Sequence, residues 1–327
     1  MGRVGRGAYL RNSIGDVNYF VYTLKELGRL QPTSSARRSG VRACTSTGMA
    51  ARDDGDNGSM TNTNFGRADC AALTAAELLV NHWRDGLHLD ELPAACRPAT
   101  PEQGRAVQTL WAGITADRIA GWKIAATSQA GQAHIAVGGP IAGPVFARHV
   151  HGDGAEIDLS RNGMRVAECE IVFRFGNTLA PRAQAYTRAE VLVAVQSLHP
   201  GLEAPDSRFL HFERAGEAQL IADCACCNDM LVGAAVPPDE RVVSLPALRV
   251  QAWVSDGRRA EGLGRNVLGD PVAALLWLVN ELASTGRTLE AGQFVTTGAC
   301  VAPIPVQPGQ QVSADFGWIG RIGARFV

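Results

Sequence analysis

The sequence has no apolar run long enough to cross a membrane. Its longest apolar stretch, Val272–Val279, is far shorter than the ~18 residues that a membrane helix needs. No apolar segment followed by a cleavage-like site stands near the start. Lysine is scarce as well, because Lys123 is the sole lysine after Lys25. We therefore predict no membrane segment. The isolated position of Lys123 in an arginine-dominated chain makes it a residue whose role needs an explanation.

Cysteine spacing, net charge and glycine pattern exclude further classes. The eight cysteines are irregularly spaced, which favours reduced thiols in a cytoplasm over a disulfide framework. The net charge is -1, so the chain carries no global signature of nucleic-acid binding. The stretch Gly138–Gly143 has neither a phosphate-binding-loop pattern nor a dinucleotide fingerprint. We therefore predict no nucleotide cofactor.

The composition that is present indicates an α+β fold. The 327 residues are 46% hydrophobic, so they can bury a large core in one or two domains. The 36 glycines and 16 prolines imply many turns, which favours short strands with scattered helices over a helical bundle.

Residues 1–59 differ from the rest of the chain. They contain nine Lys/Arg against five Asp/Glu, together with ten Ser/Thr, and end in a run with no apolar residue. We predict a disordered extension, which either an organellar transit peptide or an over-extended start upstream of Met60 would explain. We then predict a small helical lobe over 60–120 and a catalytic β-rich domain over 121–327.

Capping residues and breakers predict the helices. Ser/Thr/Asp at an N-cap with Glu or Gln three residues later, or with Pro at the first position, marks a start, and Gly or Pro marks an end. The predicted helices run from Thr74 to Gly86, from Thr100 onward, through the polar stretch Thr127–His134, from Thr187 to Pro200 and from Asp270 to Gly286.

Runs of β-forming residues predict the strands. These runs are Gly121–Ala126, which carries Lys123 near its end, then Val166–Arg174, Gly201–Phe209, Phe294–Thr297, Gln311–Phe316 and Arg321–Val327.

Three glutamates on two predicted strands suggest a metal site. Strand side chains alternate between faces, so Glu168 and Glu170 point the same way about 7 Å apart. Glu-x-Glu pairs are common on solvent-facing strands, so the pair alone is a weak signal. Glu203, on a strand that a helix could return beside the first, would add a third oxygen ligand. Such a set suits Mg²⁺, Mn²⁺ or Ca²⁺ rather than Zn²⁺ or copper.

The open positions of such a metal would chelate a substrate with a carboxylate and an adjacent 2-oxo or enol oxygen. Asp206 and Arg208 could pair to orient Glu203, although a plain surface ion pair is at least as reasonable.

Several ordered motifs resemble one known family. They are Gly-Trp-Lys-Ile-Ala-Ala-Thr-Ser at 121–128, Ala-Glu-Cys-Glu-Ile at 167–171, Gly-Leu-Glu-Ala-Pro-Asp-Ser-Arg at 201–208, Leu-Gly-Asp-Pro at 268–271 and Ala-Gly-Gln-Phe-Val-Thr-Thr-Gly at 291–298. From about residue 70 onward, the chain resembles the 2-keto-4-pentenoate hydratase and 2-oxo-3-enedioate decarboxylase branch of the fumarylacetoacetate hydrolase superfamily. The resemblance implies that superfamily's β-rich mixed-sheet roll.

The resemblance also implies roles. Glu168, Glu170 and Glu203 would bind Mg²⁺ or Mn²⁺, and Lys123 would meet the substrate and assist proton transfer. A bound cation and partial burial would lower the pKa of Lys123 toward the range useful for acid-base work.

The implied enzyme is a hydratase of 2-hydroxypenta-2,4-dienoate-like acids in aromatic catabolism. A 2-oxo-3-enedioate decarboxylase is the alternative, and a non-catalytic partner subunit is the rival outside enzymes. A homo-oligomer is expected, with possible association with a sister decarboxylase or hydratase. A C–C bond hydrolase would need a water-activating His-Glu dyad, and we place none.

Two departures from the family pattern limit the prediction. Hydratases of this kind carry an acid-base Asp after the lysine motif, yet Val137–Gly143 contains no carboxylate. Asp223–Cys226 reads Asp-Cys-Ala-Cys where these enzymes tend to have Asp-Asn-Ala-Ser. The cysteines there, with Cys227, are better explained by core packing than by a soft-metal site.

Two other candidates have plain explanations. His149 and His151 are predicted to lie in a solvated glycine-rich loop. Ser128 has no base nearby in sequence, so a nucleophilic triad is unsupported.

Overall fold

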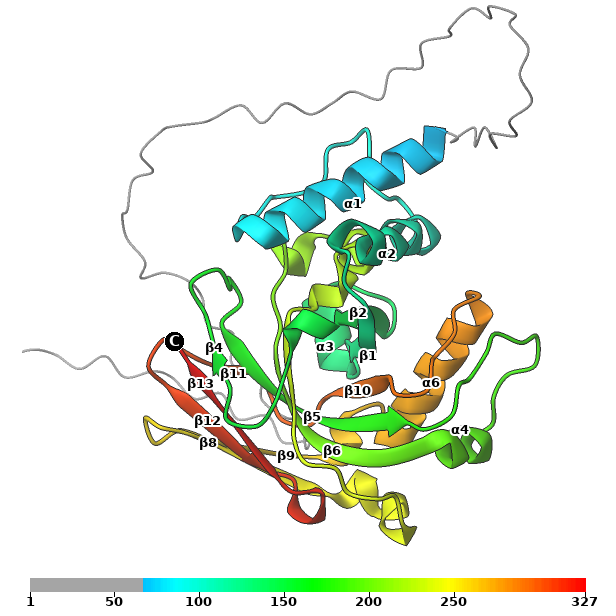
Figure 1. Cartoon of the computed structure of the whole chain (residues 1–327). Helices are drawn as coiled ribbons and strands as arrows, with labels where there is room; N and C mark the ends of the chain where they lie inside the picture. Colours follow the sequence, from blue (N-terminus) through cyan, green and yellow to red (C-terminus); the bar gives the residue numbers. More distant parts are fainter. Residues whose placement is uncertain (1–66) are drawn as a thin grey trace, which may run out of the picture. The chain divides into compact units, whose positions relative to one another are not determined.

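The computed structural model describes residues 67–327. The predicted extension over 1–59 lies outside these residues, as does the start of the predicted lobe. The described part of the chain combines helices with two mixed β-sheets (Figure 1). The predicted α+β class with a mixed-sheet roll is therefore confirmed, whereas the domain boundaries stay predictions.

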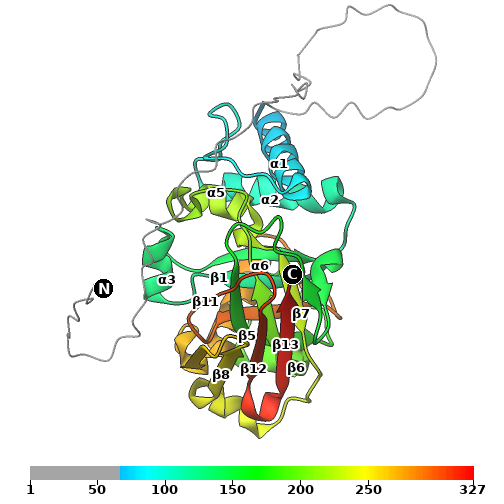
Figure 2. The same ribbon diagram turned by 90° about the vertical axis from the view of Figure 1, so that its left-hand side faces the viewer.

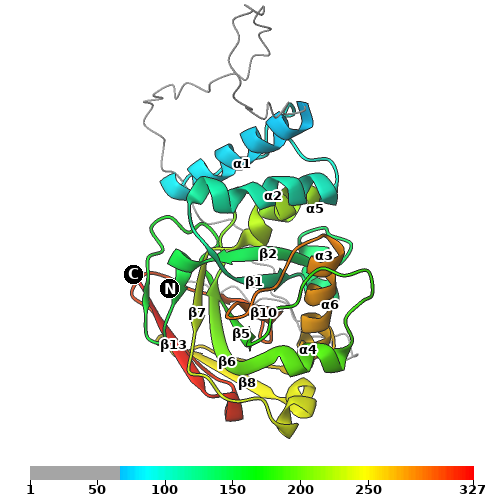
Figure 3. The same cartoon turned by 45° about the vertical axis from the view of Figure 1, so that its right-hand side comes forward.

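The helices lie on different sides of the sheets. In Figures 1 and 3, α1 and α2 lie together on one side, and α6 lies beside β10. The α-helices are α1 (Arg67–Asp85), α2 (Pro101–Thr115), α3 (Gln129–His134), α4 (Arg188–Ala194), α5 (Glu217–Ala222) and α6 (Pro271–Ser284).

The strands form a larger and a smaller sheet. The larger sheet has the order β2-β1-β10-β5-β6-β7-β3, with β11 paired to β5, and the smaller has the order β4-β13-β12-β8-β9 (Figure 2). The strands are β1 (Ile119–Ala125), β2 (Ile141–Phe146), β3 (Val150–His151), β4 (Glu156–Ile157), β5 (Val166–Phe175), β6 (Val195–Ala204), β7 (Asp229–Val232), β8 (Arg249–Val254), β9 (Arg259–Leu263), β10 (Phe294–Ala299), β11 (Ile304–Pro305), β12 (Gln311–Asp315) and β13 (Arg321–Phe326).

Alternation along β5 separates two environments. Ile171 and Phe173 are fully buried in the core that the larger sheet shares with the smaller one. Val172, between them, packs instead in the cluster that contains α1 and α2. Glu168 and Glu170 share the face of Val172, because side chains two apart on a strand point the same way. The two glutamates therefore face away from the core between the sheets.

The helix predicted from Thr187 to Pro200 is shorter than expected. Thr187 does form a capping box with Glu190, but α4 ends at Ala194. The following residues form β6, which also contains Pro200, and not a helix. Pairing with β5 and β7 on both sides outweighs the helical pattern, and Pro200 contributes a carbonyl that accepts from the Gly233 N–H at 2.9 Å. The strand predicted from Gly201 thus begins six residues earlier, at Val195, and ends at Ala204 rather than Phe209.

The first helix also differs from its prediction. It begins at Arg67, so Thr74 lies inside it and its hydroxyl donates to the Cys70 carbonyl at 2.9 Å. A mid-helix threonine commonly bonds back to the carbonyl one turn earlier, and this mimics a capping signal in sequence. The predicted end is confirmed, since Gly86 adopts a φ of +64°.

One stretch of the described chain, Gly264–Ser284, passes a length and composition test for a membrane helix. Its mean hydropathy is 1.3, and half of the tested window is buried inside the structure. Its α-helical part, α6, starts as predicted with the Asp270 side chain accepting from the Val272 N–H. Leu275 and Leu278 are fully buried in the core between the sheets. This stretch therefore serves as a core helix.

Candidate metal centre

Three glutamates converge on one face of the larger sheet. Strands β5 and β6 pair so that Glu168 lies directly opposite Glu203, and Glu170 lies opposite Gly201. One carboxylate oxygen from each glutamate lies within 4.8 Å of the others. We call Glu168, Glu170 and Glu203 the carboxylate centre. The structure brings together the three residues chosen from the sequence, while their role as ligands stays a prediction.

Gly201 leaves room beside the centre. A Cβ at this position would lie 2.6 Å from both the Met230 Cε and the Val172 Cγ2 atoms. A larger residue would therefore have to displace these two side chains, which lie beside the glutamates of the centre.

Strand β10 holds Glu170 in place. The hydroxyl of Thr296 and the N–H of Gly298, the latter at 2.9 Å, both donate to the Oε2 atom of Glu170. Gly298 has a φ of +98°, and a Cβ there would lie 2.2 Å from the Thr127 hydroxyl, so only glycine fits. The sequence showed this Thr-Thr-Gly segment as part of a resemblance, but no spacing rule connected it to Glu170.

Lys123 reaches the centre across the sheet. It lies on β1 beside Thr296 of β10, and two strands separate β1 from β6. Its Nζ atom nevertheless lies 2.8 Å from the Oε1 atom of Glu203, and its side chain is 3% exposed. The contact requires the sheet to curl, so that its concave face brings β1 toward β6.

Burial and mutual repulsion govern the titration of the centre. Burial, with the charge of Glu203, raises the pKa of Glu168 to about 7. Burial, followed by Glu203 and Glu168, raises the pKa of Glu170 well above its ordinary value. Burial alone would lower the pKa of Lys123, but the three carboxylates outweigh it, and the pKa rises. The lowered pKa that we expect for Lys123 beside a bound cation stays a prediction.

The centre has the donor set of a divalent cation site. Within residues 67–327, the Oε1 atom of Glu170 and the Oε2 atom of Glu203 are buried without a hydrogen-bond partner. With all groups ionised, three carboxylates and one ammonium leave two uncompensated negative charges. Buried oxygens without partners are costly, and a hard divalent cation would satisfy both the oxygens and the charge. The residues present therefore fit such an ion.

The expected pairing of Asp206 with Arg208 is wrong. Arg208 bonds instead to the Asp223 carboxylate and to the Asp223 and Cys227 carbonyls. Asp206 accepts from the N–H groups of Gly163 and Met164 at 2.8 and 3.2 Å. The sequence around Arg208 cannot reveal this partner, because Asp223 lies at the C-terminal end of α5, a separate element.

The segment without an acid-base Asp is packed with apolar side chains. Ile141, at the start of β2, belongs to a buried cluster with Ile135 and Leu220. Gly143 lies opposite Lys123, and a Cβ there would lie 1.9 Å from the Cys224 carbonyl oxygen. The strand therefore lies against the cysteine turn and adds no titratable group.

The cysteine turn is tightly buried. Cys224, Ala225 and Cys226 have positive φ values of 52°, 53° and 60°, in a conformation that non-glycine residues rarely adopt. Their side chains and that of Cys227 are buried, as core packing predicts. Burial raises the pKa of Cys226 to about 12, so this thiol stays protonated.

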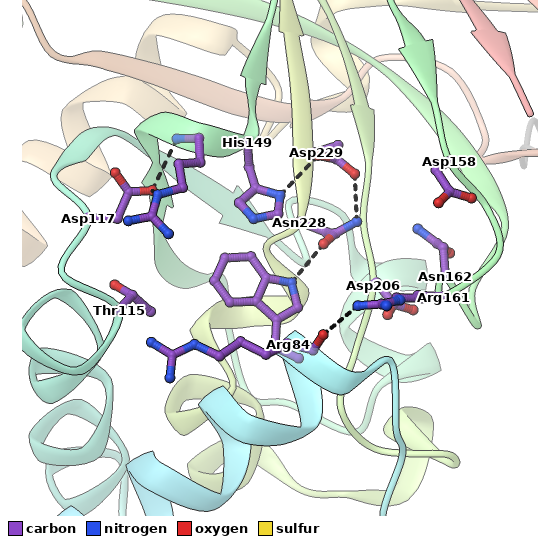
Figure 4. Close-up of a pocket in the computed structure, with 12 residues that line it drawn as sticks. Arg84, Thr115, Asp117, His149, Asp158, Arg161, Asn162, Asp206, Asn228 and Asp229 are labelled. Atoms are coloured by element: carbon purple, nitrogen blue, oxygen red, sulfur yellow. Dashed lines mark hydrogen bonds and ion pairs between the residues drawn. The ribbon is translucent and has the colours of Figure 1, made fainter.

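His149 and His151 do not lie in a solvated loop, contrary to the prediction. Both rings hydrogen-bond to the Oδ1 atom of Asp229, that of His149 at 2.9 Å (Figure 4) and that of His151 at 2.8 Å. Trp83 stacks on the His149 ring at 4.3 Å and donates to the Asn228 side chain. Trp83, His149, Asn228 and Asp229 line a cavity of about 290 Å³. Acidic and basic groups are mixed in its lining, which indicates no ligand class.

Comparison with known proteins places the chain in a family. Residues 127–327 match the family described as fumarylacetoacetate (FAA) hydrolase C-terminal. The chain is 28% identical over 257 residues to 2-keto-4-pentenoate hydratase 1 of Dechloromonas aromatica, a match that covers 77% of the chain and 96% of the hydratase. It is 31% identical over 206 residues to a 4-oxalocrotonate decarboxylase of a Pseudomonas species, covering 63% of the chain and 77% of the decarboxylase.

A solved structure agrees with these matches. The 4-oxalocrotonate decarboxylase from Pseudomonas putida G7, complexed with magnesium and adipate, superposes with a TM-score of 0.70 at 26% identity, covering 78% of this chain and 97% of the decarboxylase. The same protein is also known complexed with calcium and acetate, with a TM-score of 0.69. From its matching residues and its fold, the chain belongs to the fumarylacetoacetate hydrolase family of enzymes.

Proposed function

We propose that this chain is a divalent-metal-dependent lyase that acts on small 2-oxo or 2-hydroxy acids. Its leading reaction is hydration of 2-hydroxypenta-2,4-dienoate-like substrates in aromatic catabolism. The observation that carries the proposal is the carboxylate centre, with two buried oxygens that have no partner in the described chain. The relatives named as hydratases, which match over nearly their whole length, support it.

Glu168, Glu170 and Glu203 would hold the cation, for which Mg²⁺ is the first choice and Mn²⁺ the second. The magnesium and calcium complexes of the structural neighbour support a hard divalent ion. When bound, the cation supplies Lewis-acid stabilisation of negative charge that develops on the substrate's 2-oxygen. Thr296 and Gly298 keep Glu170 oriented for this role.

Lys123 is the residue that we propose to carry a proton. Its buried Nζ atom lies beside Glu203, at the edge of the space where a chelated acid would present its carboxylate and 2-oxygen. The ammonium would bind one of these oxygens. It would give its proton to the terminal carbon of the dienol, and the resulting amine would take the proton of the 2-hydroxyl, so that a 2-oxo-3-enoate forms and Lys123 is again an ammonium. Water then adds to the conjugated alkene.

Decarboxylation of a 2-oxo-3-enedioate is a second candidate. It is favoured by the apolar packing of Ile141, because segment 137–143 supplies no base to activate water. Loss of CO₂ needs stabilised charge on the 2-oxygen and one proton donor, and Lys123 can serve as that donor. The structural neighbour named as a decarboxylase supports this candidate as well.

The decisive experiment compares both substrate classes. Purified protein is incubated with Mg²⁺ or Mn²⁺ and either a 2-hydroxydienoate or a 2-oxo-3-enedioate, while the dienol absorbance and the product mass are followed. Gain of one water identifies a hydratase, and loss of CO₂ identifies a decarboxylase. A chelator-treated sample is the control, and it should be inactive until the metal is restored.

A metal-loaded protein that turns over neither substrate would contradict the catalytic proposal. That result would favour a non-catalytic subunit that associates with a sister hydratase or decarboxylase. Sedimentation analysis of the same sample tests the further proposal that the chain forms a homo-oligomer.

A further inference from the structure

A separate cavity lies near the strand that carries Lys123. It has a volume of about 530 Å³ and lies between α2, the start of β1 and the loop 287–293. Its lining includes Trp122, which precedes Lys123 on β1. Because side chains alternate along a strand, the Trp122 ring lies on the face of β1 opposite to that of Lys123. The cavity is large enough for a small organic molecule. We call it the arginine cavity.

Positive charge around the arginine cavity is not neutralised. Arg118 and Arg287 line it, and Arg174 donates to the carbonyl of Gly292, another lining residue, at 2.8 Å. Across residues 67–327, none of these three guanidinium groups lies within 4.0 Å of a carboxylate, unlike twelve other arginines, which form such ion pairs. The one carboxylate in the lining, that of Glu290, is exposed.

The guanidinium groups also affect one another. Burial, followed by the charge of Arg118, lowers the pKa of Arg174. Burial likewise lowers the pKa of Arg287, and Glu281, which opposes that shift, is itself bonded to Arg105 at 3.3 Å. Burial is the main cause of both shifts, and a bound anion would oppose them.

Neutral groups hold Arg287 in position. Its Nη1 atom donates to the Gln108 side chain at 2.7 Å, and its Nε atom donates to the Thr285 hydroxyl at 3.1 Å. Gln108 is itself anchored through its amide nitrogen to the carbonyls of Ala142 and Ile221. Within the described chain, the Nη2 atom of Arg287 and the whole guanidinium of Arg118 have no hydrogen-bond partner. The free Nη2 donor of Arg287 is thus held in position, and the exposed Arg118 adds further donors for a ligand.

The rest of the lining is largely apolar. The Arg287 guanidinium lies 5.2 Å from the centre of the Trp122 ring, and Ile119 and Pro144 extend the same wall. A guanidinium on an aromatic ring beside an apolar wall suits a ligand with a charged end and a flat hydrocarbon body.

We propose that the arginine cavity binds a small organic carboxylate, separately from the carboxylate centre. The carboxylate group bonds to Arg287 and Arg118, and its unsaturated or aromatic body lies against the wall formed by Trp122, Ile119 and Pro144. Carboxylate binding to guanidinium groups is strong because both partners are charged and two parallel hydrogen bonds can form.

The test is calorimetric titration of the full chain with benzoate in the presence of Mg²⁺. We expect one saturable site per chain. Arg118→Gln and Arg287→Gln should each weaken binding at least about fivefold, since each removes a charged hydrogen bond. Arg259→Gln, which alters an exposed arginine on β9, is the matched control and should leave binding unchanged. Benzyl alcohol, which has the same ring without the charge, should not bind.

Each contrary outcome is informative. Binding that a chelator abolishes, and that neither arginine variant weakens, would place benzoate on the bound metal and overturn the proposal. The absence of saturable binding would overturn it too.

If Arg118→Gln instead dissociates an oligomer in sedimentation while benzoate does not bind, the cavity is a contact between copies and the proposal is wrong. If Arg287→Gln fails to fold, Arg118→Gln decides, because the Arg118 guanidinium has no partner in the described chain to lose.

Discussion

Two buried groups of charges in this protein are built in opposite ways. The pair Arg208–Asp223 is almost inaccessible, and every nitrogen and oxygen of the two charged groups has a hydrogen-bond partner, with Ser207 donating to the second carboxylate oxygen at 2.7 Å. In the carboxylate centre Glu170 and Glu203 are equally buried and Glu168 is half-buried, yet the centre holds like charges together and leaves two oxygens without partners in residues 67–327. A buried ion pair whose charges and hydrogen-bonding groups are all partnered within the protein supports the fold. A buried cluster of like charges with unpartnered oxygens needs a ligand.

The largest expected effect comes from removing one charge of the centre. Glu170→Gln keeps the shape of the side chain but removes a charged ligand, so we expect tight metal binding and turnover to be abolished. Calorimetric titration with Mg²⁺ measures the first and the substrate assay measures the second. Glu156→Gln, an exposed glutamate paired with Arg325, is the control. Unchanged metal affinity in Glu170→Gln would remove Glu170 from the proposed ligands.

The next effect separates metal binding from chemistry. In Lys123→Met the cation is retained, because losing the ammonium makes the centre more negative, but proton transfer fails. We expect turnover to fall by about 10²–10⁴-fold at normal metal content. Metal analysis and the substrate assay on one preparation measure both quantities. Full activity in this variant would refute the role of Lys123.

Breaking the Arg208–Asp223 pair should lower the stability of the fold and leave metal binding unchanged. Asp223→Asn leaves the Arg208 guanidinium buried without its counter-charge, so we expect a loss of about 3–5 kcal/mol in the free energy of unfolding. Urea denaturation measures it. Asp239→Asn breaks an exposed pair with Arg241 and should cost under about 1 kcal/mol. If Asp223→Asn folds stably but loses Mg²⁺, the contrast between the two groups is wrong.

The smallest expected effect on metal affinity comes from Thr296, which bonds to Glu170 at the edge of the carboxylate centre. Thr296→Val removes the hydroxyl that orients Glu170 while it preserves the side-chain shape, and we expect metal affinity to fall about 10–100-fold. Thr109→Val, at an exposed hydroxyl that bonds within α2, is the control. Equal metal affinity in both variants would show that Thr296 does not orient the ligand.

Local signals predicted much of the fold. The caps at Thr100 and Asp270 and the glycine at Gly86 mark helix ends correctly, because each satisfies backbone groups within a few residues. The signals at Thr74 and Thr187 misled in part. A threonine can bond back inside a helix, and strand pairing can end a helix that the apolar pattern alone would continue.

The candidate site shows the same division. The spacing of Glu168 and Glu170 placed them on one face, because strand geometry alone imposes that alternation. Glu203 was chosen because a helix could return its strand beside the first, and the role of Lys123 rested on the resemblance. The structure brings all four residues together. The partner of Arg208 and the anchors of His149 could not be foreseen, because Asp223 and Asp229 come from distant segments.

The sequence by itself determined the α+β class, most element types, and which side chains share a face, because these depend on contacts between near neighbours. Only the tertiary structure decided that β1 curls toward β6, so that Lys123 touches Glu203, and that two buried oxygens of the centre have no hydrogen-bond partner in residues 67–327. It also decided that three arginines lie at one cavity with no carboxylate of residues 67–327 within 4.0 Å of their guanidinium groups. Charge balance depends on which distant segments meet, and a linear pattern does not contain that information.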